Sequence, residues 1–191
     1  MTDNICKGIT KVIWGYFFLY FNLNLFGLNI LPSFVGYLLF LAAISLMKNE
    51  ERELSLLYIL GVVMTLWTLA EWLASFVGLS LDGRWQFADI IVALVNMYFH
   101  FQLLTNLASV AAKHQGEGGT LDKRILFYRT LQTVMLTVVN VVLFISPLFF
   151  ELRPIITLCI GIVYVIAGIC IMSVLRSLRR CVVAEKGTNN T

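Results

Sequence analysis

Long runs of apolar residues, broken only by short polar segments, constrain this chain more than any other feature. Of its 191 residues, 59% are hydrophobic and 13% are charged, whereas about a quarter of the residues in a typical soluble domain are charged. A soluble domain of this length could not hide so much apolar surface. The sequence therefore predicts an all-α, polytopic membrane protein, a bundle of transmembrane helices with the bilayer as its solvent.

Six apolar blocks are long enough to cross a bilayer, which takes about 20 residues per helix. They cover about 10–27, 31–47, 54–79, 86–110, 126–149 and 155–175. No cleavage site of small residues follows the first block, so it is expected to stay as a span and not to be removed as a signal peptide. The connections leave no room for a soluble domain. We therefore expect a single bundle of six spans over residues 1–191, with residues 176–191 as a cytoplasmic tail.

The basic residues predict the orientation, because cytoplasmic loops of membrane proteins carry an excess of Lys and Arg. With the N-terminus inside, twelve of the 14 basic residues fall in cytoplasmic segments, and only Arg84 and Arg153 fall outside. An odd number of spans would place the four basic residues of the C-terminal tail outside the cell. Both termini are therefore expected in the cytoplasm. The charges lie between apolar blocks and form no single patch, so no nucleic-acid partner is expected.

The connection between the first two blocks carries no charge. Residues 22–37 read NLNLFGLNILPSFVGY, and Pro32 suits the first turn of a helix because it has no amide hydrogen and a fixed φ. The first two spans are therefore expected to form a tight antiparallel hairpin.

This stretch resembles the opening hairpin of small multi-pass membrane proteins of Gram-positive bacteria, which carry the pattern N-I-L-P-x-x-x-G-Y. The resemblance covers about 30 residues and implies a bacterial cytoplasmic membrane and a multi-pass topology, but no reaction. In size, the chain is also similar to the six-span substrate-binding subunits of vitamin importers. Its first span lacks the A-x-x-x-A pattern with which those subunits dock to their transporter module.

Ionisable residues inside predicted spans point to a polar site, because they are costly in lipid. Glu71 is the clearest, deep in the third span. In the fourth span Asp89, Asn96 and His100 are separated by 7 and 4 residues, so they fall within about 40° of one another on the helix. Such a polar face must meet protein or water.

Further polar residues share this depth. Asn140 and Tyr164, like Glu71 and Asn96, lie about nine or ten residues from the outer ends of their spans, and Asn22 lies slightly shallower. Two interpretations stay open for this layer: hydrogen bonds that hold helices together, or an outward-facing cavity. Aromatic residues nearby, such as Tyr16 and Tyr20, are interpreted as packing or lipid-facing side chains.

Signatures of catalysis are weak. The sequence has no HExxH or GxSxG motif, and its four cysteines form no CxxC pair. Zinc could in principle bind His100, Glu71 and Asp89, but Asp89 lies about three turns from His100 on one helix. No cofactor, metal site or catalytic residue is therefore predicted, and an intramembrane enzyme stays as a minority alternative.

The leading hypothesis is binding or transport of a small polar solute through the outward-facing cavity. Its expected lining is Glu71, Asn96, His100, Asn140, Tyr164 and Asn22, with Glu71 and His100 as a proton-coupling pair. The alternative is a non-catalytic membrane subunit or accessory protein of a larger complex. The expected partners are lipid, a small solute, and a second copy of the chain or another membrane protein.

Overall fold

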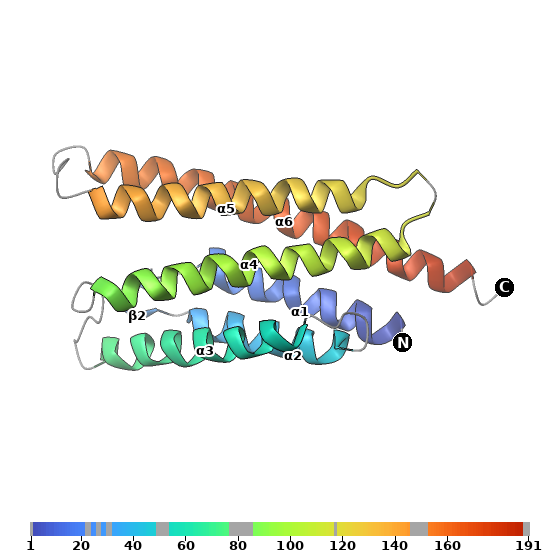
Figure 1. Cartoon of the computed structure of the whole chain (residues 1–191), viewed down its shortest axis with the longest axis horizontal. Helices are drawn as coiled ribbons and strands as arrows, with labels where there is room; N and C mark the ends of the chain where they lie inside the picture. The colour runs from blue at the N-terminus through green and yellow to red at the C-terminus, as the bar shows by residue number, and fades with distance from the viewer. Residues whose placement is uncertain are drawn as a thin grey trace.

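The computed structural model describes residues 2–21, 24–25, 28–29, 32–48, 54–76, 86–116, 118–145 and 153–188. Over these ranges the chain forms six helices, which confirms the predicted all-α class. They are α1 (Thr2–Tyr20), α2 (Ser33–Met47), α3 (Leu54–Phe76), α4 (Gln86–His114), α5 (Leu121–Ile145) and α6 (Arg153–Thr188) (Figure 1). Between α1 and α2 lie two short strands, β1 (Asn24–Leu25) and β2 (Leu28–Asn29).

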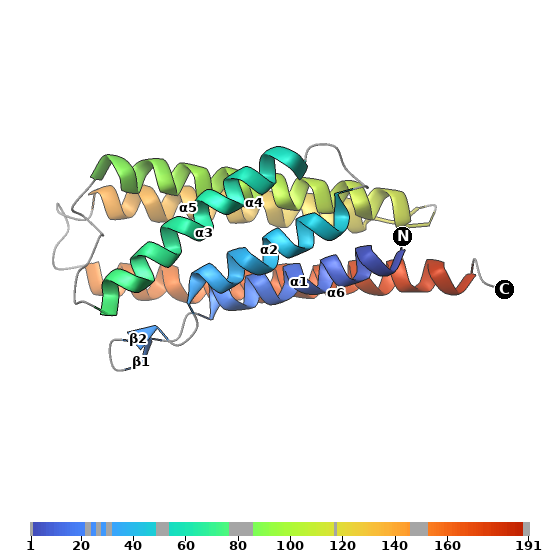
Figure 2. The same cartoon turned by 90° about the horizontal axis from the view of Figure 1, so that it is seen from below.

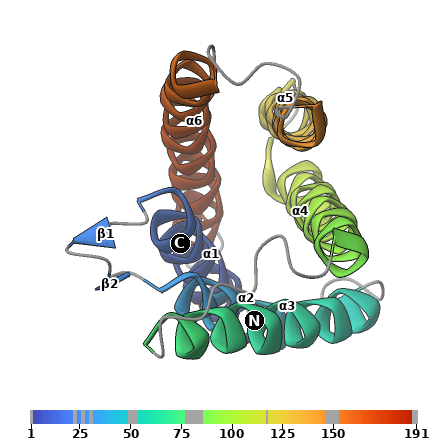
Figure 3. The same ribbon diagram turned by 90° about the vertical axis from the view of Figure 1, so that its left-hand side faces the viewer.

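Each helix packs against its neighbours in the sequence, and α6 closes the arrangement by packing against α1. Seen end-on, the helices therefore follow one another around a ring (Figure 3). The helix α3 runs obliquely to α4 and α5 (Figure 2). Both termini lie at the same end of the bundle, beside the connection between α4 and α5 (Figure 1).

The surface of the bundle is that of a membrane protein. Three segments in the described part of the chain are long and apolar enough to cross a bilayer: Ser55–Phe76, Phe87–His114 and Gly161–Glu185. Large apolar side chains are exposed along one stripe of α3, at Ile59, Val63, Leu66 and Leu73. Exposed apolar surface of this extent requires a lipid environment or a protein partner.

The first helix begins earlier and ends earlier than the first predicted span. Its buried residues Ile5, Ile9, Val12 and Tyr16 follow helical spacing, so an apolar face extends the helix back past the lysines of its opening turns. It ends at Tyr20, and β1 pairs antiparallel with β2 in the register Asn24↔Asn29 and Leu25↔Leu28. The strand pair takes the place of the last predicted turns.

The expected antiparallel hairpin of α1 and α2 is present, and glycine allows the two backbones to come close. A Cβ atom on Gly15 would lie 3.0 Å from the carbonyl oxygen of Gly36, and one on Gly36 would lie 2.9 Å from that of Gly15. Pro32 stands just before α2 with φ −69° and ψ 134°. It is therefore an extended residue that precedes the helix, and the prediction that placed it in the first turn is corrected by one position.

Candidate functional site

His100 lies at the centre of the bundle, on the face of α4 that meets α1 and α2. Its side chain is only 4% exposed. Its Nδ1 atom lies 3.4 Å from the hydroxyl oxygen of Tyr16, and the edge of Phe40 packs against its ring at a centroid distance of 5.7 Å. A buried imidazole with one hydroxyl partner keeps a second ring nitrogen for another hydrogen bond.

Asn96 stands one turn before His100 on the same face of α4. Its Oδ1 atom accepts a hydrogen bond of 2.7 Å from the hydroxyl group of Tyr37, which comes from α2 and is 2% exposed. The predicted polar face of the fourth span therefore meets protein at these two positions. The contact also fixes the rotation of α4 relative to α2, because a buried hydroxyl without a partner is costly.

Tyr20 and Tyr164 continue the site from α1 to α6. Their ring centroids are 4.4 Å apart, and Tyr20 also stacks on Tyr16 at 5.9 Å. Gly168, one turn after Tyr164, leaves the space that the Tyr20 ring fills, since a Cβ atom there would overlap the ring. Tyr16 and Tyr20 thus connect His100 on α4 with Tyr164 on α6.

Two polar atoms in this region are buried without a hydrogen-bond partner among the described residues. They are the hydroxyl oxygen of Tyr20 and the Oε1 atom of Gln132. Gln132 is a buried residue of α5 that lies beside the hydroxyl group of Tyr16. Each such atom costs roughly 1–3 kcal/mol if nothing satisfies it, so the site has hydrogen-bonding capacity for a water molecule or a solute.

We refer to these residues as the tyrosine–histidine cluster. It consists of Tyr16, Tyr20, Tyr37, Asn96, His100, Gln132 and Tyr164. Five helices contribute to it: α1, α2, α4, α5 and α6.

Glu71 lies at the edge of the cluster and does not pair with His100. The indole Nε1 of Trp67, one turn earlier on α3, donates a hydrogen bond to its Oε1 atom, and Tyr37 is near enough to interact with it electrostatically. No hydrogen bond or ion pair joins Glu71 to His100 in the described part of the chain. Tyr37 interacts with both residues, with the ring of His100 and electrostatically with Glu71.

Asn140 takes no part in the cluster. Its side chain is exposed, and its amide group donates to the backbone oxygen of Leu136 in its own helix. One turn earlier, the hydroxyl group of Thr137 lies 3.4 Å from the sulfur of Met97, so Thr137 itself lies at the contact between α5 and α4. Asn22, also predicted in the site, lies outside the described residues.

The structure therefore gathers three of the six predicted site residues, Asn96, His100 and Tyr164. Sequence reasoning missed Tyr16, Tyr20 and Tyr37 as partners. The spacing of Tyr16 and Tyr20 by one helical turn was the available signal, because it puts two hydroxyl groups on one face.

No family model, curated protein or solved structure matches the chain. Within the described ranges, no three His, Cys, Asp or Glu side chains come together as metal ligands would. The function therefore has to be argued from the chemistry of the cluster.

Proposed function

We propose that the protein binds a small polar solute at the tyrosine–histidine cluster and carries it into or across the membrane. The observation that supports this most is the pair of unsatisfied buried atoms, Tyr20 Oη and Gln132 Oε1, at a place where five helices meet. A solute with hydrogen-bond donors would satisfy the amide oxygen, which can only accept. The tyrosine rings would provide flat walls for stacking.

The chemistry of the cluster favours a solute without net charge. Its members are hydroxyl, amide and imidazole groups, and the carboxylate of Glu71 stands at the edge and is already hydrogen-bonded to Trp67. Burying a charged solute among neutral groups would carry a large desolvation cost. A neutral molecule with several hydrogen-bonding groups fits better.

Proton coupling is part of this proposal, but through Tyr37 and not through a direct pair of Glu71 and His100. Tyr37 interacts with Glu71 electrostatically and hydrogen-bonds to Asn96, and its ring centroid lies 6.2 Å from that of His100. A proton held at Glu71 would therefore act on the cluster through Tyr37, since an intramembrane carboxyl group changes its neighbours most strongly when it ionises.

We also propose six spans in a bacterial cytoplasmic membrane, with both termini in the cytoplasm. Exposed apolar side chains follow one face of α5 at Phe127, Leu131, Val134 and Val138, as expected for a helix beside lipid. The shared end of the two termini (Figure 1) is consistent with an even number of spans. The predicted cytoplasmic excess of basic residues then places that end inside.

A thermal-shift screen tests the solute proposal, because a ligand that binds only the folded protein raises its melting temperature. Neutral polar solutes are added to the purified protein in detergent, and each hit is repeated with Tyr20→Phe and with Tyr98→Phe. Tyr98 is an exposed tyrosine of α4 and serves as the matched control. We expect Tyr98→Phe to keep the shift and Tyr20→Phe to lose most of it. If both variants keep the shift, the solute binds elsewhere.

A second function, that of an accessory subunit, is favoured by α5. Asn140 is exposed there, and a neighbouring helix that donates to its side-chain oxygen would satisfy it better than lipid does. Asn140→Leu separates the two proposals. If the cluster is the solute site, Asn140→Leu should leave the solute-induced thermal shifts unchanged. If α5 is an interface, the same change should weaken association with a second copy or another membrane protein, as measured by in-membrane crosslinking.

A further inference from the structure

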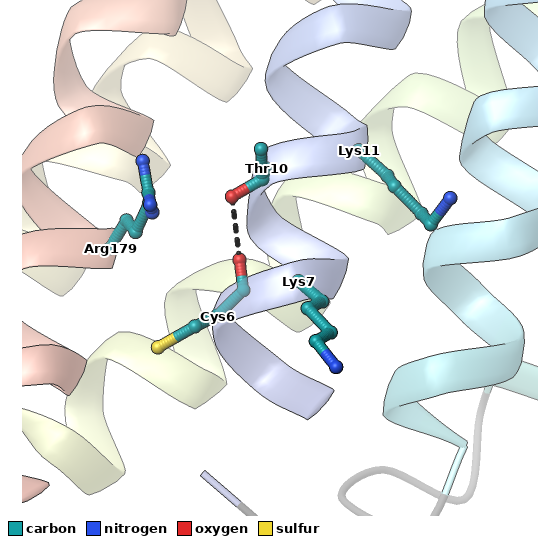
Figure 4. A pocket seen from close by; sticks show the side chains of 5 residues that line it. All are labelled: Cys6, Lys7, Thr10, Lys11 and Arg179. Atoms are coloured by element: carbon teal, nitrogen blue, oxygen red, sulfur yellow. Dashed lines mark hydrogen bonds between the residues drawn. The ribbon is translucent and has the colours of Figure 1, made fainter. Parts of the chain in front are cut away.

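A groove of about 410 Å³ lies between the first half of α1 and the last part of α6. Its lining is Cys6, Lys7, Thr10, Lys11 and Arg179. Figure 4 shows Arg179 on the α6 side, while the two lysines lie on the other side of Cys6 and Thr10. In this view α1 lies between Arg179 and the two lysines, and the lysine side chains point away from Arg179.

No acidic side chain lines this groove in the described part of the chain. The hydroxyl hydrogen of Thr10 is used in a 2.8 Å bond to the backbone oxygen of Cys6, so the three cations are the main donors left. Three positive charges along one groove favour the binding of an anion there. Arg and Lys side chains are also the usual partners of phosphate groups.

The position of the groove along the bundle points to the membrane surface. Arg179 follows Arg153 by 26 residues of continuous helix, a rise of about 39 Å. The hydrocarbon core is about 30 Å thick, and the whole bilayer with its headgroups is about 40–45 Å thick. If α6 begins at one surface, Arg179 reaches the headgroup layer of the other.

We propose that this groove binds the phosphate group of an anionic lipid. The guanidinium group of Arg179 contacts the phosphate from α6, and the flexible side chains of Lys7 and Lys11 turn toward it from α1. The lipid joins the first helix to the last at the point where the ring of helices closes. This site is separate from the tyrosine–histidine cluster and does not depend on the proposed solute.

Native mass spectrometry in detergent tests the proposal by titrating the full chain with phosphatidylglycerol and, in parallel, with zwitterionic phosphatidylcholine. The variants are Lys11→Gln, Arg179→Gln and the triple change Lys7→Gln, Lys11→Gln, Arg179→Gln. Arg180→Gln is the matched control, because Arg180 is also exposed on α6 but does not line the groove. The melting temperature of each variant without lipid shows that it is folded.

We expect one tightly held phosphatidylglycerol on the wild-type protein and on Arg180→Gln. Each single change in the groove should weaken it about fivefold, and the triple change about a hundredfold, since each cation near an anionic lipid contributes about 1 kcal/mol. Equal losses for Arg180→Gln and Arg179→Gln would mean diffuse attraction to headgroups and would overturn the proposal. Equal retention of phosphatidylcholine would overturn it as well.

Inorganic phosphate in the same titration distinguishes a lipid from a soluble anion. For a lipid site it should compete only weakly, because it lacks the acyl chains that remain in the bilayer. Complete displacement of phosphatidylglycerol by low millimolar phosphate would overturn the lipid assignment and assign the groove to a soluble anion.

Discussion

Gly168 of α6 lies directly against the aromatic ring of Tyr20 of α1, with no room for a methyl group between them. The contact continues the stacked pair of Tyr20 and Tyr164. It holds the first and last helices together at the level of the cluster.

Gly168→Ala should therefore destabilise the protein. The new methyl group overlaps the base of the Tyr20 ring, which cannot turn away without breaking its contact with Tyr164, and overpacking of this kind costs about 1–3 kcal/mol. The thermal midpoint in detergent is the measurement. Gly161→Ala, on the same helix with no atom within 4 Å of the new methyl group, is the control. A fall of the same size in both variants would mean that the effect lies in the helix and not in the contact.

The hydrogen bond between Tyr37 and Asn96 should appear as a coupling energy in a double-mutant cycle. Tyr37→Phe and Asn96→Ala each remove the 2.7 Å bond, so the double variant should lose less stability than the sum of the two single variants. The expected coupling is about 0.5–2 kcal/mol, as for other polar contacts between membrane helices. Additive losses would show that the two side chains do not interact in the folded protein.

The two glycines of α1 that face α2 should respond differently to alanine. At Gly15 the new methyl group meets the Phe40 ring and the backbone of Gly36, whereas at Gly8 it meets chiefly the flexible side chain of Met47. Gly15→Ala should therefore lower the thermal midpoint clearly, by an overpacking cost of about 1–3 kcal/mol. Gly8→Ala should have a smaller effect. The reverse order would contradict the close backbone approach of α1 and α2.

Arg129 should contribute to the packing of α5 against α4. Its guanidinium carbon lies 4.2 Å from the ring centroid of Phe101, and its Nη1 atom donates to the hydroxyl oxygen of Thr105 at 3.1 Å. Arg129→Gln should destabilise the protein by about 0.5–2 kcal/mol, mainly through loss of the cation–π contact. Arg124→Gln, at an exposed position of the same helix, should leave the midpoint unchanged in a parallel chemical-denaturation series.

The sequence predicted the helices well because their signal is local. Length and apolar composition define them, and the spacing of Asn96 and His100 correctly put both on one inward face. The end of α1 was misplaced because residues 24 and 25 stand within a mostly apolar stretch but pair with β2 instead of continuing the helix. That pairing requires residues 28 and 29 to lie antiparallel beside residues 24 and 25, and a hydropathy pattern does not encode such a contact.

The partners of His100 were harder to predict for a different reason. Equal depth in two spans suggested a pair with Glu71, but contact also requires the right rotation of each helix and the right order of helices around the ring. Tyr16 reaches His100 although α1 packs mainly against α2 and α6 and not against α4. A hydropathy pattern fixes depth and one buried face, whereas the neighbour across that face follows from the three-dimensional arrangement.

The placement of Tyr16 and Tyr20 one turn apart on α1 puts this helix in contact with both α4 and α6. Tyr16 contacts His100 of α4, and Tyr20 contacts Tyr164 of α6, while Gly15 fixes the same helix against α2. A tilt or rotation of α1 would therefore disturb both contacts at once. The contacts on the two sides of the cluster are therefore coupled through α1.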